Sequence, residues 1–221
     1  MSTDRNGGVE FRHALAARRA AVRTIRKLRA MSSSPRYDVR IEALEALSDC
    51  AFELDLESVV RKAIHNRDEL VRVTAIEVAG NHALKSMQAE IVGRLKSDRS
   101  WLVRSTAAVA LGDMSAKETR NILEDRVRLA GEEERVGLYY ALVKLGVRKD
   151  LIPFLQGLRH NFYRIRCATA NLIPGLVDKG NKRTLLRRLR EALDHEETVA
   201  AQSSLKSTLK KLSNGFKVPR P

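Results

Sequence analysis

The chain has 221 residues, of which 43% are apolar, 5% aromatic and 31% charged, and its formal net charge is +14. The apolar share is too high for a disordered chain. The shortage of aromatic residues, Gly and Pro argues against sheet sandwiches, which need aromatic and β-branched strands broken by frequent turns. The composition therefore favours a helical protein.

The first predicted element is an amphipathic helix from Phe11 to Leu28. Its apolar residues recur at helical spacing, and basic residues gather on the opposite face. This basic face comprises Arg12, Arg19, Arg23, Arg26 and Lys27. Residues 1–8 before the helix are polar and contain glycines, so we expect them to be disordered.

A repeated pattern follows, with a period of about 32 residues. Arg40, Arg72 and Arg104 are spaced at intervals of 32, and Arg166 stands 62 residues after Arg104. The copy between the last two is either degenerate or shifted: matching its end to the preceding copy places Leu138 in the arginine column, with Arg135 three residues earlier. A sixth, weaker copy begins near residue 198. Each copy predicts a helix.

A second amphipathic run precedes each of these helices from residue 56 onwards. The runs cover residues 56–64, 87–95, 119–129, 151–158 and 185–193. Gly80, Gly112 and Gly146 are expected just past the second helix of their pairs, as left-handed C-caps. One helix pair of this size cannot bury its own apolar stripe, so we expect the pairs to stack on one another.

These repeats resemble the HEAT-repeat family, particularly its short bacterial form of the PBS-lyase type. The segment Leu151-Ile152-Pro153-Phe154-Leu155 resembles the family's first helix with its characteristic proline. The second-helix pattern Asp/Glu-x-x-Val-Arg-x-x-Ala-x-x-Ala-Leu-Gly is recognisable from residue 36 to 176. The resemblance implies an all-α superhelix (solenoid) of about six helix pairs over residues 9–213. An extended basic tail would follow at 214–221.

The arginine column has two interpretations. It could line a groove with positive charge, or it could form a structural ladder between neighbouring repeats. We favour the ladder, because the column also recurs in repeats of balanced charge and because acids such as Asp38, Asp68 and Asp98 stand in the preceding turns. The ladder residues are Arg40, Arg72, Arg104 and Arg166.

The positive charge is concentrated at the two ends of the chain. Residues 1–36 hold nine basic and two acidic residues, residues 181–221 hold ten and four, and the 144 residues between them hold 22 and 21. Towards the C-terminus, Arg183, Arg187 and Arg190 lie opposite a leucine stripe, and Lys206, Lys210 and Lys211 follow on the last helix. We expect these residues, together with the N-terminal basic face, to bind an anionic surface.

Catalytic and cofactor motifs are absent from the sequence. The five histidines are scattered without metal-ligand spacing, and there is no phosphate-binding or dinucleotide-binding glycine loop. Cys50 and Cys167 lie in apolar helical patterns, which favours buried thiols in a reducing cytoplasm. Uncharged stretches are too short to span a bilayer. We therefore predict a cytoplasmic protein without enzymatic activity, metal or cofactor.

The favoured function is protein binding, as an adaptor, scaffold or regulatory subunit that docks a larger acidic partner. The alternative is nucleic-acid binding through the basic ends, although few aromatic residues lie there to stack on bases. HEAT-like alkyl-base DNA glycosylases depend on several tryptophans, whereas Trp101 is the only one here. Phycobilin lyases also carry such repeats, but no motif here points to a bilin. The oligomeric state stays open.

Overall fold

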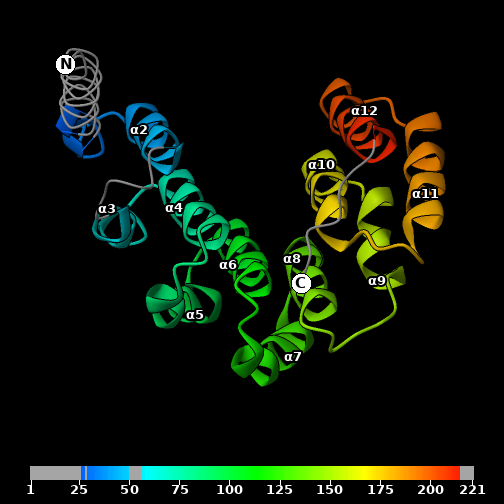
Figure 1. Ribbon diagram of the computed structural model, residues 1–221, viewed down its shortest axis with the longest axis horizontal. Coiled ribbons are helices and arrows are strands. Elements are labelled where there is room, and N and C mark those ends of the chain that lie inside the picture. Colours follow the sequence, from blue (N-terminus) through cyan, green and yellow to red (C-terminus); the bar gives the residue numbers. More distant parts are fainter. Residues whose placement is uncertain (1–25, 28, 50–55, 215–221) are drawn as a thin grey trace, which may run out of the picture. The chain divides into compact units, whose positions relative to one another are not determined.

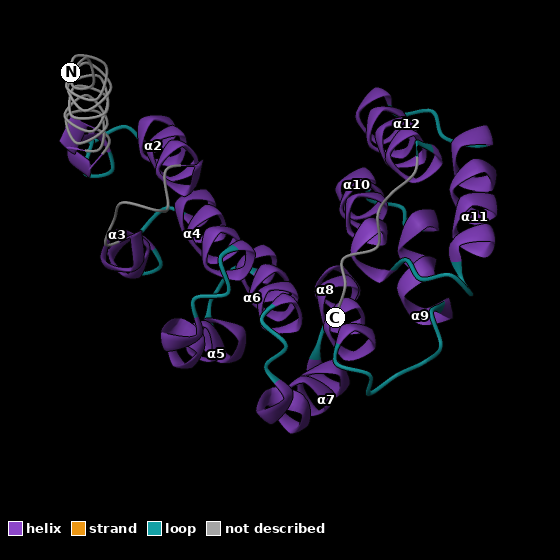
Figure 2. Cartoon of the chain, in the orientation of Figure 1, coloured by secondary structure: helices purple, strands orange, loops and turns teal. Residues whose placement is uncertain are grey.

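The computed structural model of the protein describes residues 26–27, 29–49 and 56–214. All regular elements in these ranges are helices, and none of the described residues forms a strand (Figure 2). Several predictions fall outside the described residues. They concern most of the N-terminal helix with Arg12, Arg19 and Arg23, the expected disorder of residues 1–8, Cys50, and the tail beyond Asn214. Cys167 is a free thiol and is half-buried.

The described helices alternate between first and second members of a pair, as the repeats predict. The first helices are α3 (Leu56–Ala63), α5 (Gln88–Ser97), α7 (Arg120–Leu129), α9 (Ile152–Leu155) and α11 (Lys182–Asp194). The second helices are α2 (Tyr37–Asp49), α4 (Glu69–Asn81), α6 (Trp101–Asp113), α8 (Glu132–Lys144), α10 (Tyr163–Leu172) and α12 (Val199–Ser213). Short 3-10 turns extend some of them: η2 (Lys85–Met87), η3 (Lys117–Thr119), η4 (Gln156–Arg159) and η5 (Ile173–Leu176).

The chain forms two compact units, residues 1–87 and 88–221. In the first unit α2 packs on α4, and α3 packs on both of these helices. Leu44, Leu47, Val60 and Ile76 are fully buried there. Their burial follows from the helical spacing of apolar residues in the sequence.

The second unit has two layers of helices (Figure 1). The second helices α6, α8, α10 and α12 pack each on the next, and the first helices cover them. At the α6–α8 junction the helices approach closely through small residues. A Cβ atom on Gly112 would lie 2.9 Å from Cα of Ala141, and one on Gly137 would lie 2.2 Å from the carbonyl oxygen of Ser105. The missing side chains therefore set how near these two helices lie.

The turns after α4 and α6 differ from the prediction that a glycine ends each of these helices. Gly80 and Gly112 lie inside α4 and α6 and are not their left-handed caps. The left-handed position comes three residues later, at Ala83 (φ 47°) and Ser115 (φ 55°), and only Gly146 (φ 71°) occupies it as predicted. The helices are therefore about one turn longer than the glycines suggest.

Candidate functional site

Arginine fills the fourth position of five consecutive second helices, α2, α4, α6, α8 and α10. These residues are Arg40, Arg72, Arg104, Arg135 and Arg166, and Gln202 takes the same position in α12. Counted from the first residue of its helix, Arg135 therefore belongs to the column. Helix α8 begins 31 residues after α6, one residue fewer than the period of 32 seen in the earlier repeats. Leu138 is fully buried in the core. The copy that looked irregular in the sequence is therefore shifted and still carries the arginine.

Side chains of this column bind the carbonyl oxygen six residues upstream, in the turn before their own helix. The contacts are Arg40 Nη1 to Ser34 O (2.7 Å), Arg72 Nη1 to Asn66 O (2.9 Å), Arg104 Nη1 to Asp98 O (2.7 Å), Arg166 Nη1 to His160 O (2.8 Å) and Gln202 Nε2 to Glu196 O (2.6 Å). Turn carbonyls have no helical partner and need such donors when they are buried. The column therefore fixes the turns that precede α2, α4, α6, α10 and α12.

Two of the arginines also bind a carboxylate of the following pair, 30 residues further along the chain. Arg104 Nε lies 2.8 Å from Glu134 Oε2. Arg166 makes a bidentate pair with Glu196, with Nε 2.6 Å from Oε2 and Nη2 2.8 Å from Oε1. Glu134 also accepts from Arg126 Nη2 at 2.9 Å, and it is only 1% exposed. These contacts connect neighbouring pairs through buried charge.

Two of the acids that we expected as partners, Asp38 and Asp68, have other contacts. Asp38 pairs with Arg36, and Asp68 Oδ1 accepts from the backbone N–H groups of Leu70 and Val71 at the start of α4. Asp98 gives Arg104 its backbone carbonyl, and its side chain accepts from Arg94 Nη1 at 3.3 Å and from the N–H of Ser100 at 3.0 Å. The partners that the sequence reasoning missed, Glu134 and Glu196, share a spacing of 30 residues from an arginine. This spacing was the available signal.

Comparison with known families agrees with this repeating arrangement. A family model described as HEAT repeats matches residues 25–112 and 56–142, which together make up more than half of the chain. The chain belongs to the HEAT-repeat family. The all-α solenoid fold class predicted from the sequence is thereby confirmed. None of the curated proteins searched matches the chain.

HEAT repeats are generally protein-interaction scaffolds and are typically non-catalytic. Among the described residues, no group of three or more His, Cys, Asp or Glu side chains is placed to hold a metal ion. As far as the described residues extend, no helix combines the length and the apolar character that crossing a membrane requires.

The basic residues predicted near the C-terminus lie on the surface of α11 and α12. All six, Arg183, Arg187, Arg190, Lys206, Lys210 and Lys211, are exposed. Arg187 pairs with Glu191 at 2.6 Å, whereas the other five have no ion pair within the described parts of the chain. In the first unit, Arg26 and Lys27 are also exposed. The exposed basic residues of α11 and α12 are thus available to a partner.

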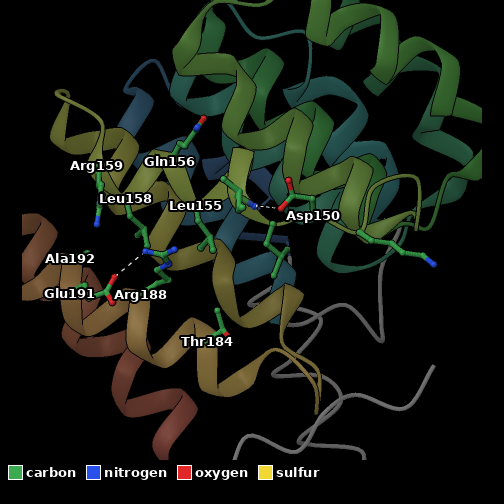
Figure 3. Close-up of a pocket in the computed structure, with 12 residues that line it drawn as sticks. Asp150, Leu155, Gln156, Leu158, Arg159, Thr184, Arg188, Glu191 and Ala192 are labelled. Atoms are coloured by element: carbon green, nitrogen blue, oxygen red, sulfur yellow. Dashed lines mark hydrogen bonds and ion pairs between the residues drawn. The ribbon is translucent and has the colours of Figure 1, made fainter.

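An apolar groove runs between the α9–η4 segment and α11 (Figure 3). Its volume is about 540 Å³, and its apolar lining includes Leu151, Ile152, Leu155 and Leu158. Ile152 is 61% exposed, which is unusual for a large aliphatic side chain. A polar hollow of about 620 Å³ adjoins the groove and shares four residues with it: Leu158, Arg159, Glu191 and Ala192.

Helix α11 presents its groove-lining face and its basic face side by side. Thr184, Arg188, Glu191 and Ala192 face the groove, while Arg183, Arg187 and Arg190 lie about a third of a turn away on a helix of 3.6 residues per turn. Glu191 joins the two faces, because it accepts from Arg187 at 2.6 Å and from Arg188 at 3.2 Å. An apolar surface is therefore bordered directly by positive charge.

The aromatic residues of the second unit divide between core and surface. Tyr140 is buried beside Phe154, and its Oη donates to Asp113 Oδ1 at 2.6 Å. Burial, and then the charge of Asp113, raise the pKa of Tyr140. At the surface, the Phe162 ring lies 6.4 Å from the Trp101 ring, edge to face. None of these rings is on α11 or α12, so these two helices offer no aromatic ring on which a base could stack.

The Arg166–Glu196 pair predicts a pH dependence of stability. Hydrogen bonds from Arg166 lower the pKa of Glu196 to about 2 against the opposing effect of burial, and the N–H of Thr198 adds to the lowering. Since the ordinary value is 4.5, the pair's stabilisation is complete above about pH 5 and is lost as the pH falls towards 2. We expect Glu196→Gln to lower the urea midpoint at pH 6 and to differ little from wild type at pH 2.

The control for this measurement is Glu197→Gln, which alters an exposed neighbouring carboxylate. Its midpoint should follow the wild-type curve over the same pH range. A constant difference between Glu196→Gln and wild type from pH 6 to pH 2 would contradict the assigned role of the pair.

Proposed function

We propose that the protein is a non-catalytic binding module, acting as an adaptor, scaffold or regulatory subunit, that docks an acidic protein partner. The observation that carries this proposal is the apolar groove beside α11, bordered by the basic face of the same helix. Protein interfaces combine an apolar centre with a charged rim. The general role of HEAT repeats as protein-interaction scaffolds supports the same conclusion.

The proposed partner segment is amphipathic and acidic. Its apolar side chains would lie against Ile152, Leu155 and Leu158, and its carboxylates would face Arg183 and Arg190, which have no ion pair within the described residues. Laying an apolar helix face into a hydrophobic groove is a recurring mode of peptide recognition. The basic rim would speed association and select against basic segments.

Nucleic-acid binding is the second candidate, supported by the exposed lysines of α12. Lys206 and Lys210 line a hollow of about 470 Å³ together with Val199, Gln202, Ser203 and Ser207. Lysines at such a surface can contact phosphates. However, Val199 is 79% exposed at the hollow, and α11 and α12 contain no aromatic residue to stack on bases. A partner with apolar side chains suits this surface better than a phosphate backbone.

The test compares two aspartate substitutions at exposed aliphatic residues of the second unit. Ile152→Asp places a charge in the groove, whereas Leu129→Asp places one at a residue that is 78% exposed and does not line the groove. Both variants should remain folded, because neither side chain is buried. We expect Ile152→Asp to reduce partner retention at least about 10-fold, because the partner's apolar face would have to bury a charge. Leu129→Asp should retain the partner as wild type does.

Retention is measured by affinity capture from native lysate at low and moderate salt, with and without nuclease. A protein that persists through nuclease and moderate salt, and is lost only with Ile152→Asp, supports the proposal. Material that vanishes on nuclease treatment, or that falls log-linearly with salt for all variants alike, favours nucleic acid. Equal retention by the two aspartate variants would exclude the groove as the docking site.

A further inference from the structure

Arg40 has an unused hydrogen-bonding edge. Its side chain is only 7% exposed, and Nη1 binds the carbonyl oxygens of Ser34 and Pro35 at 2.7 and 2.9 Å. Nε is buried and has no hydrogen-bond partner. The Nε–Nη2 edge is the one with which Arg166 holds Glu196. An unsatisfied buried donor costs stability, so the arrangement calls for a ligand or a functional reason.

The cause lies in the next helix pair, which provides no acid to this edge. Glu134, which serves Arg104, stands at the third position of α8, and Glu196, which serves Arg166, stands three residues before α12. The corresponding positions of α4 hold Val71 and Asn66. The side chain of Asn66 accepts a hydrogen bond from the N–H of Asp68. No carboxylate from this pair therefore meets Arg40.

Arg135 provides an independent second case. The corresponding positions of α10 hold His160 and Ile165, again without an acid. Arg135 Nε is likewise buried without a partner. In the part of the chain that the structure describes, these two arginines are the only residues with such an orphaned side-chain atom. The orphaned Nε atoms thus coincide with the missing acids.

Arg40 is also one of the residues that line a pocket of the first unit. A hollow of about 330 Å³ is lined by Arg40 and Arg67, by Arg36 with its paired Asp38, and by Asp68, Pro35 and Tyr37. Asp38 is neutralised by Arg36, and one oxygen of Asp68 caps α4. The lining thus holds three arginines and two acids, and Tyr37, which is 49% exposed, offers an apolar contact at its side.

We propose that a carboxylate from an acidic protein segment binds Arg40 in this pocket, in the place that Glu196 takes at Arg166. The planar guanidinium edge matches a carboxylate with two parallel hydrogen bonds, and the chain itself contains the occupied form of this contact. The acidic nature of the partner rests on the proposed function. The site itself lies in the first unit and does not involve the groove beside α11.

The probe is a hexaglutamate peptide, titrated into the full-length protein at constant ionic strength while the Nε–H resonances of the arginines are followed by NMR. We expect the Arg40 Nε–H resonance to shift in a saturable manner, with sodium chloride alone producing no saturable change. Arg40→Lys keeps the charge but removes the planar edge, and it should weaken peptide binding at this pocket at least tenfold.

Asn66→Asp is the decisive variant, because it supplies the missing carboxylate internally and keeps the acceptor for the N–H of Asp68, as Asp98 does for Ser100. It should raise the unfolding midpoint and abolish the peptide-induced shift at Arg40. An unshifted Arg40 resonance in wild type, or unchanged peptide binding by Asn66→Asp, would overturn the proposal. An equal response to oligothymidylate would assign the pocket to phosphate instead. Ile152→Asp should leave the Arg40 titration unchanged. A result that contradicts the docking groove can therefore be distinguished from one that contradicts the Arg40 pocket.

Discussion

Replacing Glu134 with alanine is expected to destabilise the second unit by about 3–5 kcal/mol, the usual cost of breaking a buried ion pair from one side. The carboxylate is 1% exposed and accepts hydrogen bonds from both Arg104 and Arg126. Its removal leaves two guanidinium groups, themselves largely buried, without a counter-charge. Urea unfolding followed by circular dichroism measures the loss.

The matched control for Glu134→Ala is Asp125→Ala. Asp125 also pairs with an arginine, Arg128 at 3.2 Å, but its side chain is 69% exposed. Exposed ion pairs contribute about 0–1 kcal/mol, so this variant should remain close to wild type. If both variants lost the same small amount of stability, the Arg104–Glu134–Arg126 cluster would not be the buried connection described above.

The second large effect is expected from Gly137→Ala in the middle of α8. The new Cβ would lie 2.2 Å from the carbonyl oxygen of Ser105 and 2.5 Å from its Oγ. Because the nearest obstacle is backbone, rotation of a side chain cannot relieve the clash, and α6 and α8 must move apart. Overpacking of this kind costs about 1–3 kcal/mol and occasionally more. The unfolding free energy should fall despite the better helix propensity of alanine.

Gly93→Ala isolates the propensity effect. Gly93 lies in the middle of α5, in the same unit, and a Cβ there meets no atom within 4 Å. This variant should gain about 0.5–1 kcal/mol, since alanine is the better helix former. The two variants are therefore expected to differ by about 3 kcal/mol in urea unfolding. A gain in both would mean that the α6–α8 junction is looser than its geometry indicates.

The sequence was sufficient to predict the helix pairs because their apolar spacing is regular and the pattern recurs. It was misleading at the helix ends. Gly80 and Gly112 suggested caps, yet both lie inside helices, while Ala83 and Ser115 adopt the left-handed conformation. At Gly112 the missing side chain allows close packing, since a Cβ there would lie 2.9 Å from Cα of Ala141. A glycine in a sequence does not state whether backbone freedom or close packing requires it.

The groove and the carboxylate partners were harder to predict because they depend on which faces meet. The periodicity of residues 151–158 predicted an apolar helix, but not that Ile152 would stay exposed beside α11. Similarly, the arginine column was visible, whereas its glutamates occupy different positions in α8 and before α12. Only two residues connect α7 to α8, so Glu134 lies inside α8, whereas Glu196 lies in the turn before α12. This difference in position is not visible when the repeats are aligned by sequence.

The missing acid opposite Arg135 also affects how the second unit comes apart. Arg104 binds Glu134 across the α6–α8 junction, and Arg166 binds Glu196 across the α10–α12 junction. Between α8 and α10, the described residues form no corresponding arginine–glutamate pair; His160 Nε2 lies 3.5 Å from Glu132 Oε2, and Arg135 carries the cost of an unsatisfied donor. Local openings follow the least stable boundary of a protein. We therefore expect local opening at the boundary between α8 and α10 before opening at the α6–α8 and α10–α12 junctions.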